Sequence, residues 1–150
     1  METQIKYSKE ARTGLVNGIN KLADAVVATL GPNGRNVVID NGESPQSTKD
    51  GVTVAKSISL SNPTQELGVK LVKQAAIQTA NKAGDGTTTS TLLAREMVKA
   101  GLRAVAQGEN AVSIKRDIDK SVQTVVARLK DIAEDISSED QLEQIATVSA

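Results

Sequence analysis

Aliphatic residues recur at intervals of three and four along most of this chain, and this spacing constrains the fold more than any other feature. Because an α-helix turns once about every 3.6 residues, side chains at this spacing lie along one face of a helix. We therefore expect a mainly α fold. The spacing predicts helices at residues 9–30, 63–83 and 87–106, another from Asn110 through Ile132, and a short helix capped by Ser137 and Ser138.

Boundary residues agree with these helices. Asn62 and Pro63 suit the first positions of a helix, with Gln65 at the capping-box position. Gly31-Pro32 and Gly108 suit helix ends. The apolar spacing also predicts which side chains face inward: Leu67, Leu71, Val72, Ala75, Ala76 and Thr79 in one helix, and Leu92, Leu93, Met97, Ala100 and Val105 in the next.

A small β-hairpin is predicted between the first two long helices. Residues 36–40 form a strand candidate, and Asn41-Gly42 is a strong turn signal. A second strand at 46–48 completes the hairpin, and a short helix at 52–57 follows it. Residues 5–7 are a further short strand candidate.

The composition excludes several classes of function. The chain of 150 residues contains 18 basic and 18 acidic residues and a single aromatic residue, Tyr7, so neither charge nor base stacking favours a nucleic-acid partner. It contains no Cys and no His, which rules out thiol nucleophiles, histidine bases and zinc fingers within these residues. Any acid–base or metal chemistry must therefore use carboxylates.

The location of the protein is also predicted from composition. The polar residues 1–10 do not have the pattern of a signal peptide, and no apolar run approaches the roughly 20 residues that span a bilayer. The absence of Cys fits a reducing compartment. We expect a cytoplasmic protein without a membrane partner.

Residues Gly84-Asp85-Gly86-Thr87-Thr88-Thr89 are the strongest candidate for a functional site. Glycine lets a backbone approach a ligand closely, and the start of a helix offers free N–H groups to an anion. The threonines add hydroxyl groups, and Asp85 is suited to hold a Mg²⁺ that bridges phosphate oxygens. This segment therefore predicts a phosphate–metal site.

A purely structural interpretation is also open. Gly84 would then end one helix, and Asp85 or Thr87 would cap the next. Two further glycine-bearing turns, residues 29–35 and 49–51, favour the phosphate–metal site. No Gly-x-x-x-x-Gly-Lys-Ser/Thr segment occurs, so the site is not a P-loop.

The order and spacing of these segments closely resemble the group I chaperonins of the GroEL type, and the resemblance covers essentially the whole chain. It implies that residues 1–131 are the N-terminal part of a multihelical equatorial ATPase domain with a small β-hairpin, and that residues 132–150 begin an intermediate domain. The segments that carry it are 22–26, 29–38, 48–52, 83–89, 115–120 and 147–150.

The resemblance also implies an activity. Chaperonins of this type form homo-oligomeric rings that encapsulate non-native polypeptides, and they use ATP hydrolysis and a lid-like co-chaperonin to assist folding. ATP, Mg²⁺ and K⁺ are the implied cofactors. The alternative is a non-catalytic helical assembly module that keeps the chaperonin fold; retention of Asp50, Asp85 and the three threonines favours the ATPase.

Roles for individual residues follow from the same resemblance. Asp85 resembles the Mg²⁺ ligand, and Asp50 resembles the catalytic carboxylate that orders water and ions at the γ-phosphate. The backbone oxygens of Thr29 and Lys49, with the Thr88 hydroxyl, resemble a K⁺ site. The implied ATP- and phosphate-binding residues are Thr29, Leu30, Gly31, Pro32, Lys49, Asp50, Gly51, Asp85, Gly86, Thr87, Thr88, Thr89 and Ser149.

Three departures from the family pattern stand out. Asn33 occupies a position that is usually Lys, and residues 57–59 replace a more charged stretch. The sequence does not contain the apical domain, a later catalytic Asp, or the C-terminal equatorial half. The β-leaning residues 146–150 form the last stretch, and we expect the chain to be a fragment of a longer chaperonin.

Overall fold

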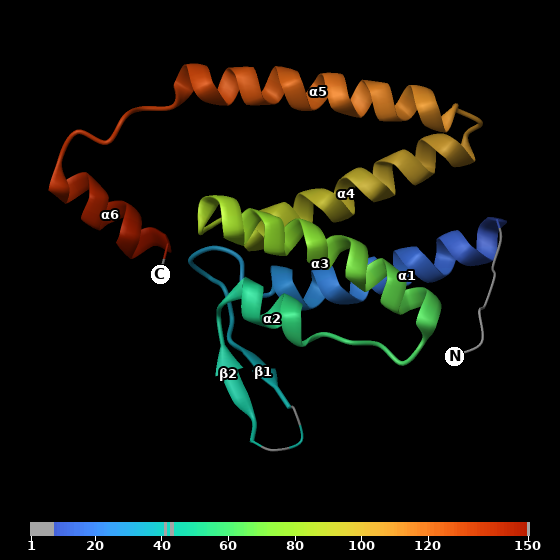
Figure 1. Cartoon of the computed structure of the whole chain (residues 1–150), viewed down its shortest axis with the longest axis horizontal. Helices are drawn as coiled ribbons and strands as arrows, with labels where there is room; N and C mark the ends of the chain where they lie inside the picture. Colours follow the sequence, from blue (N-terminus) through green and yellow to red (C-terminus); the bar gives the residue numbers. More distant parts are fainter. Residues whose placement is uncertain (1–7, 41, 43, 150) are drawn as a thin grey trace. The chain divides into compact units, whose positions relative to one another are not determined.

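The computed structural model describes residues 8–40, 42 and 44–149, which divide into two compact units, one ending at Ala100 and the other beginning at Gly101. The described chain is mainly α with one β-hairpin, as the sequence predicts (Figure 1). Its elements are α1 (Ser8–Val27), β1 (Val37–Ile39), β2 (Gln46–Thr48), α2 (Gly51–Ser57), α3 (Pro63–Ala83), α4 (Thr87–Ala106), α5 (Ala111–Ile132) and α6 (Glu139–Ser149).

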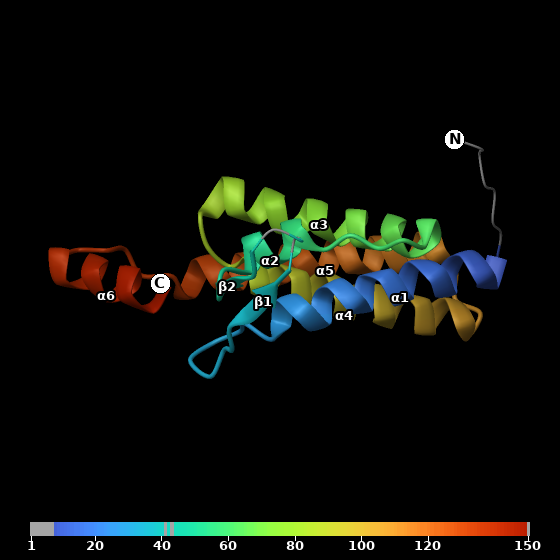
Figure 2. The ribbon, with the colours of Figure 1, turned by 90° about the horizontal axis from the view of Figure 1, so that it is seen from below.

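In the first unit, α1 and α3 lie side by side and run in the same direction (Figure 1, Figure 2). Glycine permits their close approach. A Cβ on Gly18 would overlap the backbone carbonyl of Gln65, and a Cβ on Gly68 would overlap the backbone carbonyl of Leu15. Because a larger residue at either position would force the backbones apart, these two glycines set the distance between the helices.

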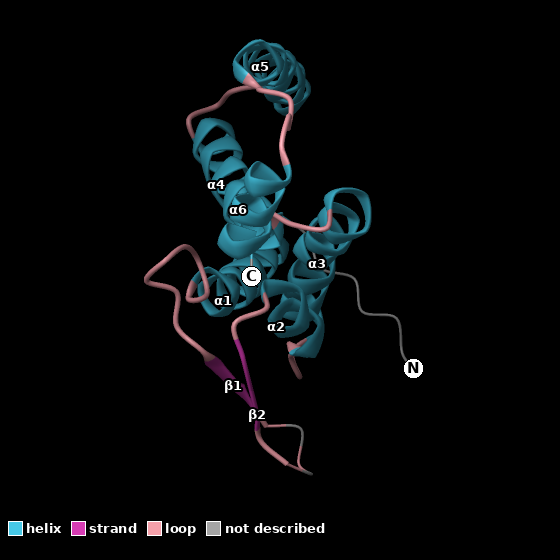
Figure 3. Cartoon of the chain, turned by 90° about the vertical axis from the view of Figure 1, so that its left-hand side faces the viewer, coloured by secondary structure: helices cyan, strands magenta, loops and turns pink. Residues whose placement is uncertain are grey.

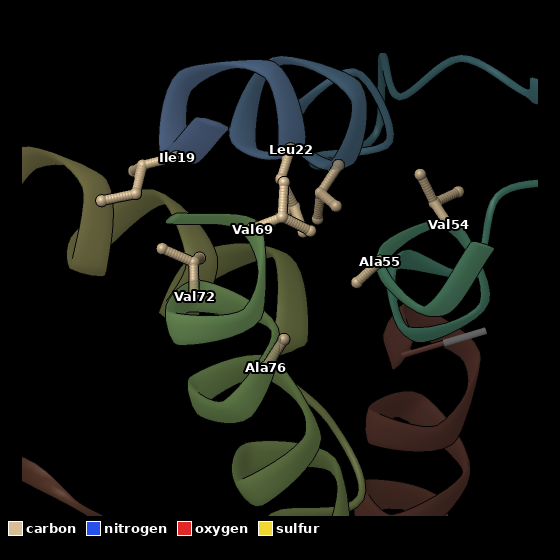
Figure 4. Packing of buried hydrophobic residues seen from close by; sticks show 8 residues of the cluster. Ile19, Leu22, Val54, Ala55, Val69, Val72 and Ala76 are labelled. Atoms are coloured by element: carbon tan, nitrogen blue, oxygen red, sulfur yellow. The ribbon is translucent and has the colours of Figure 1, made fainter. Parts of the chain in front are cut away.

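The hydrophobic core of the first unit is entirely aliphatic. Side chains from α1, α2 and α3 meet in it (Figure 4). Ala94 and Val98 of α4 pack against it. Burial of such side chains is the main favourable contribution to folding. The buried members are Ile19, Leu22, Val26, Val54, Ala55, Val69, Val72 and Ala76.

Helix α2 is held at both ends. At its N-terminus, Asp50 accepts hydrogen bonds from the backbone N–H groups of Val52 and Thr53. At its C-terminus, Lys73 Nζ of α3 donates to the carbonyl oxygens of Lys56 and Ile58 at 2.9 and 2.8 Å. Helix α2 therefore has a fixed position against α3.

Strands β1 and β2 pair antiparallel, with Val37 opposite Thr48 and Ile39 opposite Gln46. The hairpin extends away from α1, α2 and α3 (Figure 3). At the start of its turn, Gly42 N–H donates to Asp40 Oδ1 at 2.9 Å, and Gly42 has a φ of 83°. Glycine suits this left-handed conformation, so the turn signal in the sequence is confirmed at Gly42.

The second unit contains the end of α4 together with α5 and α6. Asn110 caps α5, since its Oδ1 accepts from the N–H groups of Val112 and Ser113. No side chain of α5 is buried, and its apolar residues Val122, Val125, Val126, Leu129 and Ile132 are exposed. None of the described helices is both long and apolar enough to cross a membrane.

Several sequence expectations about helix ends need correction. Helix α1 ends at Val27 and not near residue 30, because the next N–H groups form tighter turns, from Thr29 to Val26 O and from Leu30 to Val27 O. Residues 146–149 continue α6 and are not β-like. The strand expected at residues 5–7, and residues 41 and 150, lie outside the described residues.

The expected inward faces of α3 and α4 are partly wrong. Leu67 and Leu71 are each 56% exposed, whereas the neighbouring Gly68 and Val69 are buried. In α4, Leu93 and Met97 are exposed, and the buried residues are Thr87 and Thr91.

The capping box expected at the start of α3 does not occur among the described contacts. Gln65 Oε1 instead accepts a hydrogen bond from Lys21 Nζ. The next residue, Glu66, accepts through Oε2 from the N–H of Leu60.

We predict that Gly68→Ala destabilises the protein by about 1–3 kcal/mol, because the added methyl group must displace the α1 backbone. Gly101→Ala is the matched control. Its Cβ would lie 3.7 Å from Ile114 Cγ2, which is an ordinary contact, and alanine is the better helix former. Urea unfolding followed by circular dichroism measures both. Equal stability of the Gly68→Ala protein and the wild type would contradict the close packing of α1 and α3.

Candidate functional site

The loop after α1 is tightly closed. Gly34 N–H donates to Gly31 O at 2.9 Å, and Arg35 N–H donates to Ala28 O at 2.8 Å. A Cβ on Gly34 would overlap the carbonyl oxygen of Thr29, so only glycine lets the loop fold back this closely. The loop thereby holds Thr29 just beyond the end of α1.

The three glycine-bearing turns meet at Thr88. Thr29 Oγ1 and Thr88 Oγ1 lie 3.1 Å apart and form a hydrogen bond between residues that are distant in the sequence. Gly51 lies against the same hydroxyl, because a Cβ on Gly51 would overlap Thr88 Oγ1. The loop after α1, the start of α2 and the start of α4 therefore form one site within the first unit.

The turn from Gly84 to Thr89 connects α3 to α4. Gly84 ends α3 with a φ of 75°, and its N–H donates to Ala80 O, so the structural interpretation of Gly84 is confirmed. Helix α4 begins where Ser90 N–H donates to Gly86 O at 2.9 Å. The first N–H groups of a helix have no partner within it. The N–H groups of residues 87–89 therefore have no partner within the helix, and they lie at the positive end of its dipole, where an anion is favoured.

Asp85 lies in this turn and is exposed. Its Oδ1 accepts from the N–H of Gly86. Among the described residues, no group of three or more acidic side chains gathers to hold a metal ion. The donor set nevertheless fits Mg²⁺, which is commonly bound by one or two carboxylates together with substrate phosphates and water.

Asp50 has a structural role at the start of α2. Its carboxylate caps α2, and Oδ2 accepts from both the N–H and the hydroxyl of Thr53. Partial burial opposes ionisation, but the hydrogen bonds from Thr53 and Val52 together outweigh it and hold the pKa of Asp50 below its usual range. Asp50 is therefore a fixed carboxylate beside Gly51.

Two residues that shape the site, Thr53 and Gly34, were not among the site residues expected from the sequence. An Asp at the N-cap followed three residues later by Thr is a local signal that could have identified Thr53. The contact of Gly34 with Thr29 depends on the loop conformation and has no such signal.

The structure brings together most of the residues expected in the site. Thr29 and Thr88 make direct contact, with Gly51 against them. Ser149 is the last residue of α6 in the second unit, so its role stays a prediction. The other expected residues, Leu30, Gly31, Pro32, Lys49, Asp50, Asp85, Gly86, Thr87 and Thr89, lie in the three turns of the first unit or at their helix starts.

Comparison with known proteins identifies the class to which this fold and site belong. Residues 22–150 match the model of the TCP-1/cpn60 chaperonin family. The chain therefore belongs to the TCP-1/cpn60 chaperonin family.

Solved structures of one phage protein are similar to this chain. They are two crystal forms of the chaperonin gp146 from the bacteriophage EL 2 (Pseudomonas aeruginosa), both in the presence of ATP-BeFx. Form I has a TM-score of 0.78 at 33% identity and covers 95% of this chain. Form II has a TM-score of 0.75 at 33% identity and covers 91%. The match spans 26% and 24% of the phage chain, so the present chain corresponds to about a quarter of that protein.

The capping role of Asp50 predicts a pH-dependent stability. The folded pKa is below the unfolded value, so ionised Asp50 stabilises the fold above about pH 4, and this contribution is lost as the pH falls through the lowered folded pKa. Asp50→Ala should cost about 1 kcal/mol at pH 7 and clearly less at pH 2–3.

Asn62→Ala is the matched control for this measurement. Asn62 caps α3 through the N–H groups of Thr64 and Gln65, but its side chain does not titrate. Urea unfolding of both variants and the wild type at pH 7 and near pH 3 separates the two effects. Asn62→Ala should lower the free energy of unfolding by the same amount at both pH values. If the loss caused by Asp50→Ala is equally independent of pH, the capping interaction assigned to the Asp50 carboxylate is contradicted.

Proposed function

We propose that this chain forms the N-terminal nucleotide-binding part of an ATP-dependent chaperonin that assists the folding of non-native proteins. The convergence of three glycine-bearing turns on Thr88, in the first turn of α4, is the observation that carries the proposal. Membership of the chaperonin family supports it. The chain corresponds to about a quarter of the phage chaperonin, so the activity is proposed for the complete ring-forming protein.

The arrangement suits phosphoryl transfer. This chemistry depends mainly on positioning and charge neutralisation and needs no protein nucleophile. The N–H groups of Thr87 and Thr89 would bind phosphate oxygens, and Asp85 would hold Mg²⁺, which neutralises phosphate charge when bound. Asp50 is the proposed catalytic residue: its fixed, ionised carboxylate would orient the attacking water. A site without histidine is therefore sufficient.

The remaining elements of the proposal come from the family resemblance. The complete protein would assemble as a homo-oligomeric ring in the cytoplasm, bind non-native polypeptides and use a lid-like co-chaperonin. K⁺ would bind between the backbone oxygens of Thr29 and Lys49 and the Thr88 hydroxyl, and Ser149 would lie near the nucleotide. The departure at Asn33 removes one positive charge from the loop after α1.

We predict that Asp85→Asn in the complete protein lowers ATP turnover about a hundredfold or more, because the carboxylate charge that holds the metal is lost while the side-chain shape is kept. Far-UV circular dichroism should be unchanged. Asp131→Asn, at an exposed position of α5 outside the three glycine-bearing turns of the sequence, is the control and should retain turnover.

Steady-state phosphate release at several Mg²⁺ concentrations measures the effect. Near-normal turnover of Asp85→Asn with an unchanged Mg²⁺ requirement would reject the metal role. A wild-type protein that assembles but neither binds nor hydrolyses ATP would instead support the non-catalytic assembly module.

A further inference from the structure

Helix α2 carries Asp50 at its N-terminal end, so the position of this helix decides where the Asp50 carboxylate lies. The carboxylate accepts from the N–H groups of Val52 and Thr53 at 3.1 and 2.9 Å, which fixes it to the first turn of α2. A movement of α2 as a body therefore moves the proposed catalytic group with it.

A helix as short as α2 needs directional contacts to keep its tilt. It has seven residues, and at the rise of an α-helix this is a length of about 10 Å. Its buried side chains, Val54 and Ala55, lie near its middle and pack in the core shared with α1 and α3 (Figure 4). Burial of apolar surface is non-directional, so these side chains hold α2 in the core but leave its tilt to other contacts. A tilt about Val54 would displace both ends of α2.

Lys73 of α3 supplies a directional contact at the C-terminal end of α2. Its Nζ donates to Lys56 O at 2.9 Å and to Ile58 O at 2.8 Å. Carbonyl groups at this end of a helix have no partner within it, and their partial negative charge suits an ammonium group. Ser57 Oγ donates within α2, to Val54 O, and so does not tie the helix to another element. Lys73 therefore joins the end of α2 to α3.

The opposite end of α2 has little room to move towards the site. Gly51 is buried, and a Cβ on it would overlap Thr88 Oγ1, so the first residue of α2 already lies against the start of α4. Helix α3, which bears Lys73, ends at the turn that contains Asp85. Lys73 thus places α2, and Asp50 with it, relative to the same helix that leads into the Asp85 turn.

We infer that Lys73 is a positioning residue for Asp50: by holding the C-terminal end of α2 against α3, it keeps the carboxylate where it can orient the attacking water. The inference rests on the proposed function, in which Asp50 is the catalytic residue. A misplacement of about 1 Å can lower the rate of a catalysed reaction about a hundredfold, so a small tilt of α2 is sufficient. The inference gives a role in turnover to a side chain outside the expected site residues.

Lys73→Met in the complete protein removes the ammonium group and keeps an unbranched side chain. We expect kcat to fall about five- to twentyfold while the KM for ATP changes less than about twofold, because Asp50 acts on the water in the transition state and not on nucleotide binding. Lys21→Met is the matched control: Lys21 Nζ also joins two helices, α1 and α3, through Gln65 Oε1 at 2.9 Å, and the variant should retain kcat. A Lys73→Met protein with a lower melting temperature but an unchanged kcat would overturn the inference.

A double-mutant cycle with Asp50→Ala separates the inference from the proposed function. Single-turnover ATP hydrolysis measures the slow variants. Lys73→Met should have no further effect in the Asp50→Ala protein, since the group that Lys73 positions is then absent. The same fold loss in both backgrounds would overturn the inference and leave the role of Asp50 intact. A normal rate for Asp50→Ala alone would instead reject the catalytic role on which the inference rests.

The wild-type complete protein gives a test that does not depend on the variants folding. Its structure with ATP-BeFx, determined by cryo-electron microscopy, shows whether the contact persists when the site is occupied. The inference requires Lys73 Nζ within hydrogen-bond distance of Lys56 O and Ile58 O while Asp50 contacts the water next to the γ-phosphate position. An Nζ that has left both carbonyl oxygens in that state would overturn it.

Discussion

The close contact between α1 and α3 is the constraint on which the rest of the first unit depends. Gly18 and Gly68 allow the two backbones to touch, and the helices run in the same direction over 20 and 21 residues. Their C-terminal ends therefore lie on the same side of the unit, so the loop after α1 and the turn after α3 are neighbours. The hydrogen bond between Thr29 and Thr88 is the direct result.

This arrangement also explains the electrostatic character of the site. Helix α1 contributes its C-terminal end, and α4 contributes its N-terminal end. The two ends carry partial charges of opposite sign, so the site offers favourable positions for both a cation and a phosphate. Asp50 does not neutralise the start of α4, because its carboxylate is used at the start of α2. The start of α4 thus keeps the positive end of its dipole next to Thr88.

Local signals in the sequence were sufficient for much of the fold. Asn62 and Asn110 cap the helices that the sequence assigned to them, and Gly84 and Gly108 end helices with positive φ values. The buried face of α3 was harder to predict. Leucine is usually more buried than glycine, but the close approach of α1 selects the small residue Gly68 and leaves Leu71 exposed. Periodicity alone does not distinguish two adjacent apolar faces of one helix.

The candidate site was predicted at the level of its turns but not of its contacts. Glycines next to Asp50 and Asp85 marked the segments. No local pattern indicated that Thr29 and Thr88 would share a hydrogen bond across 59 positions, because that contact depends on how two distant helices pack. Thr29 Oγ1 also lies 2.7 Å from the carbonyl oxygen of Val26, whose position relative to Thr29 is set by the tight turn that ends α1.

The central claim is that three turns form a single nucleotide site, and amide NMR of the protein during titration with Mg-ATP tests it most directly. The account predicts that the N–H signals of Gly31, Gly51 and residues 87–89 shift together along one binding curve. The N–H signals of α5, such as that of Val125, should be unchanged. Shifts confined to one turn, or shifts spread over α5 with none at residues 87–89, would contradict a shared site.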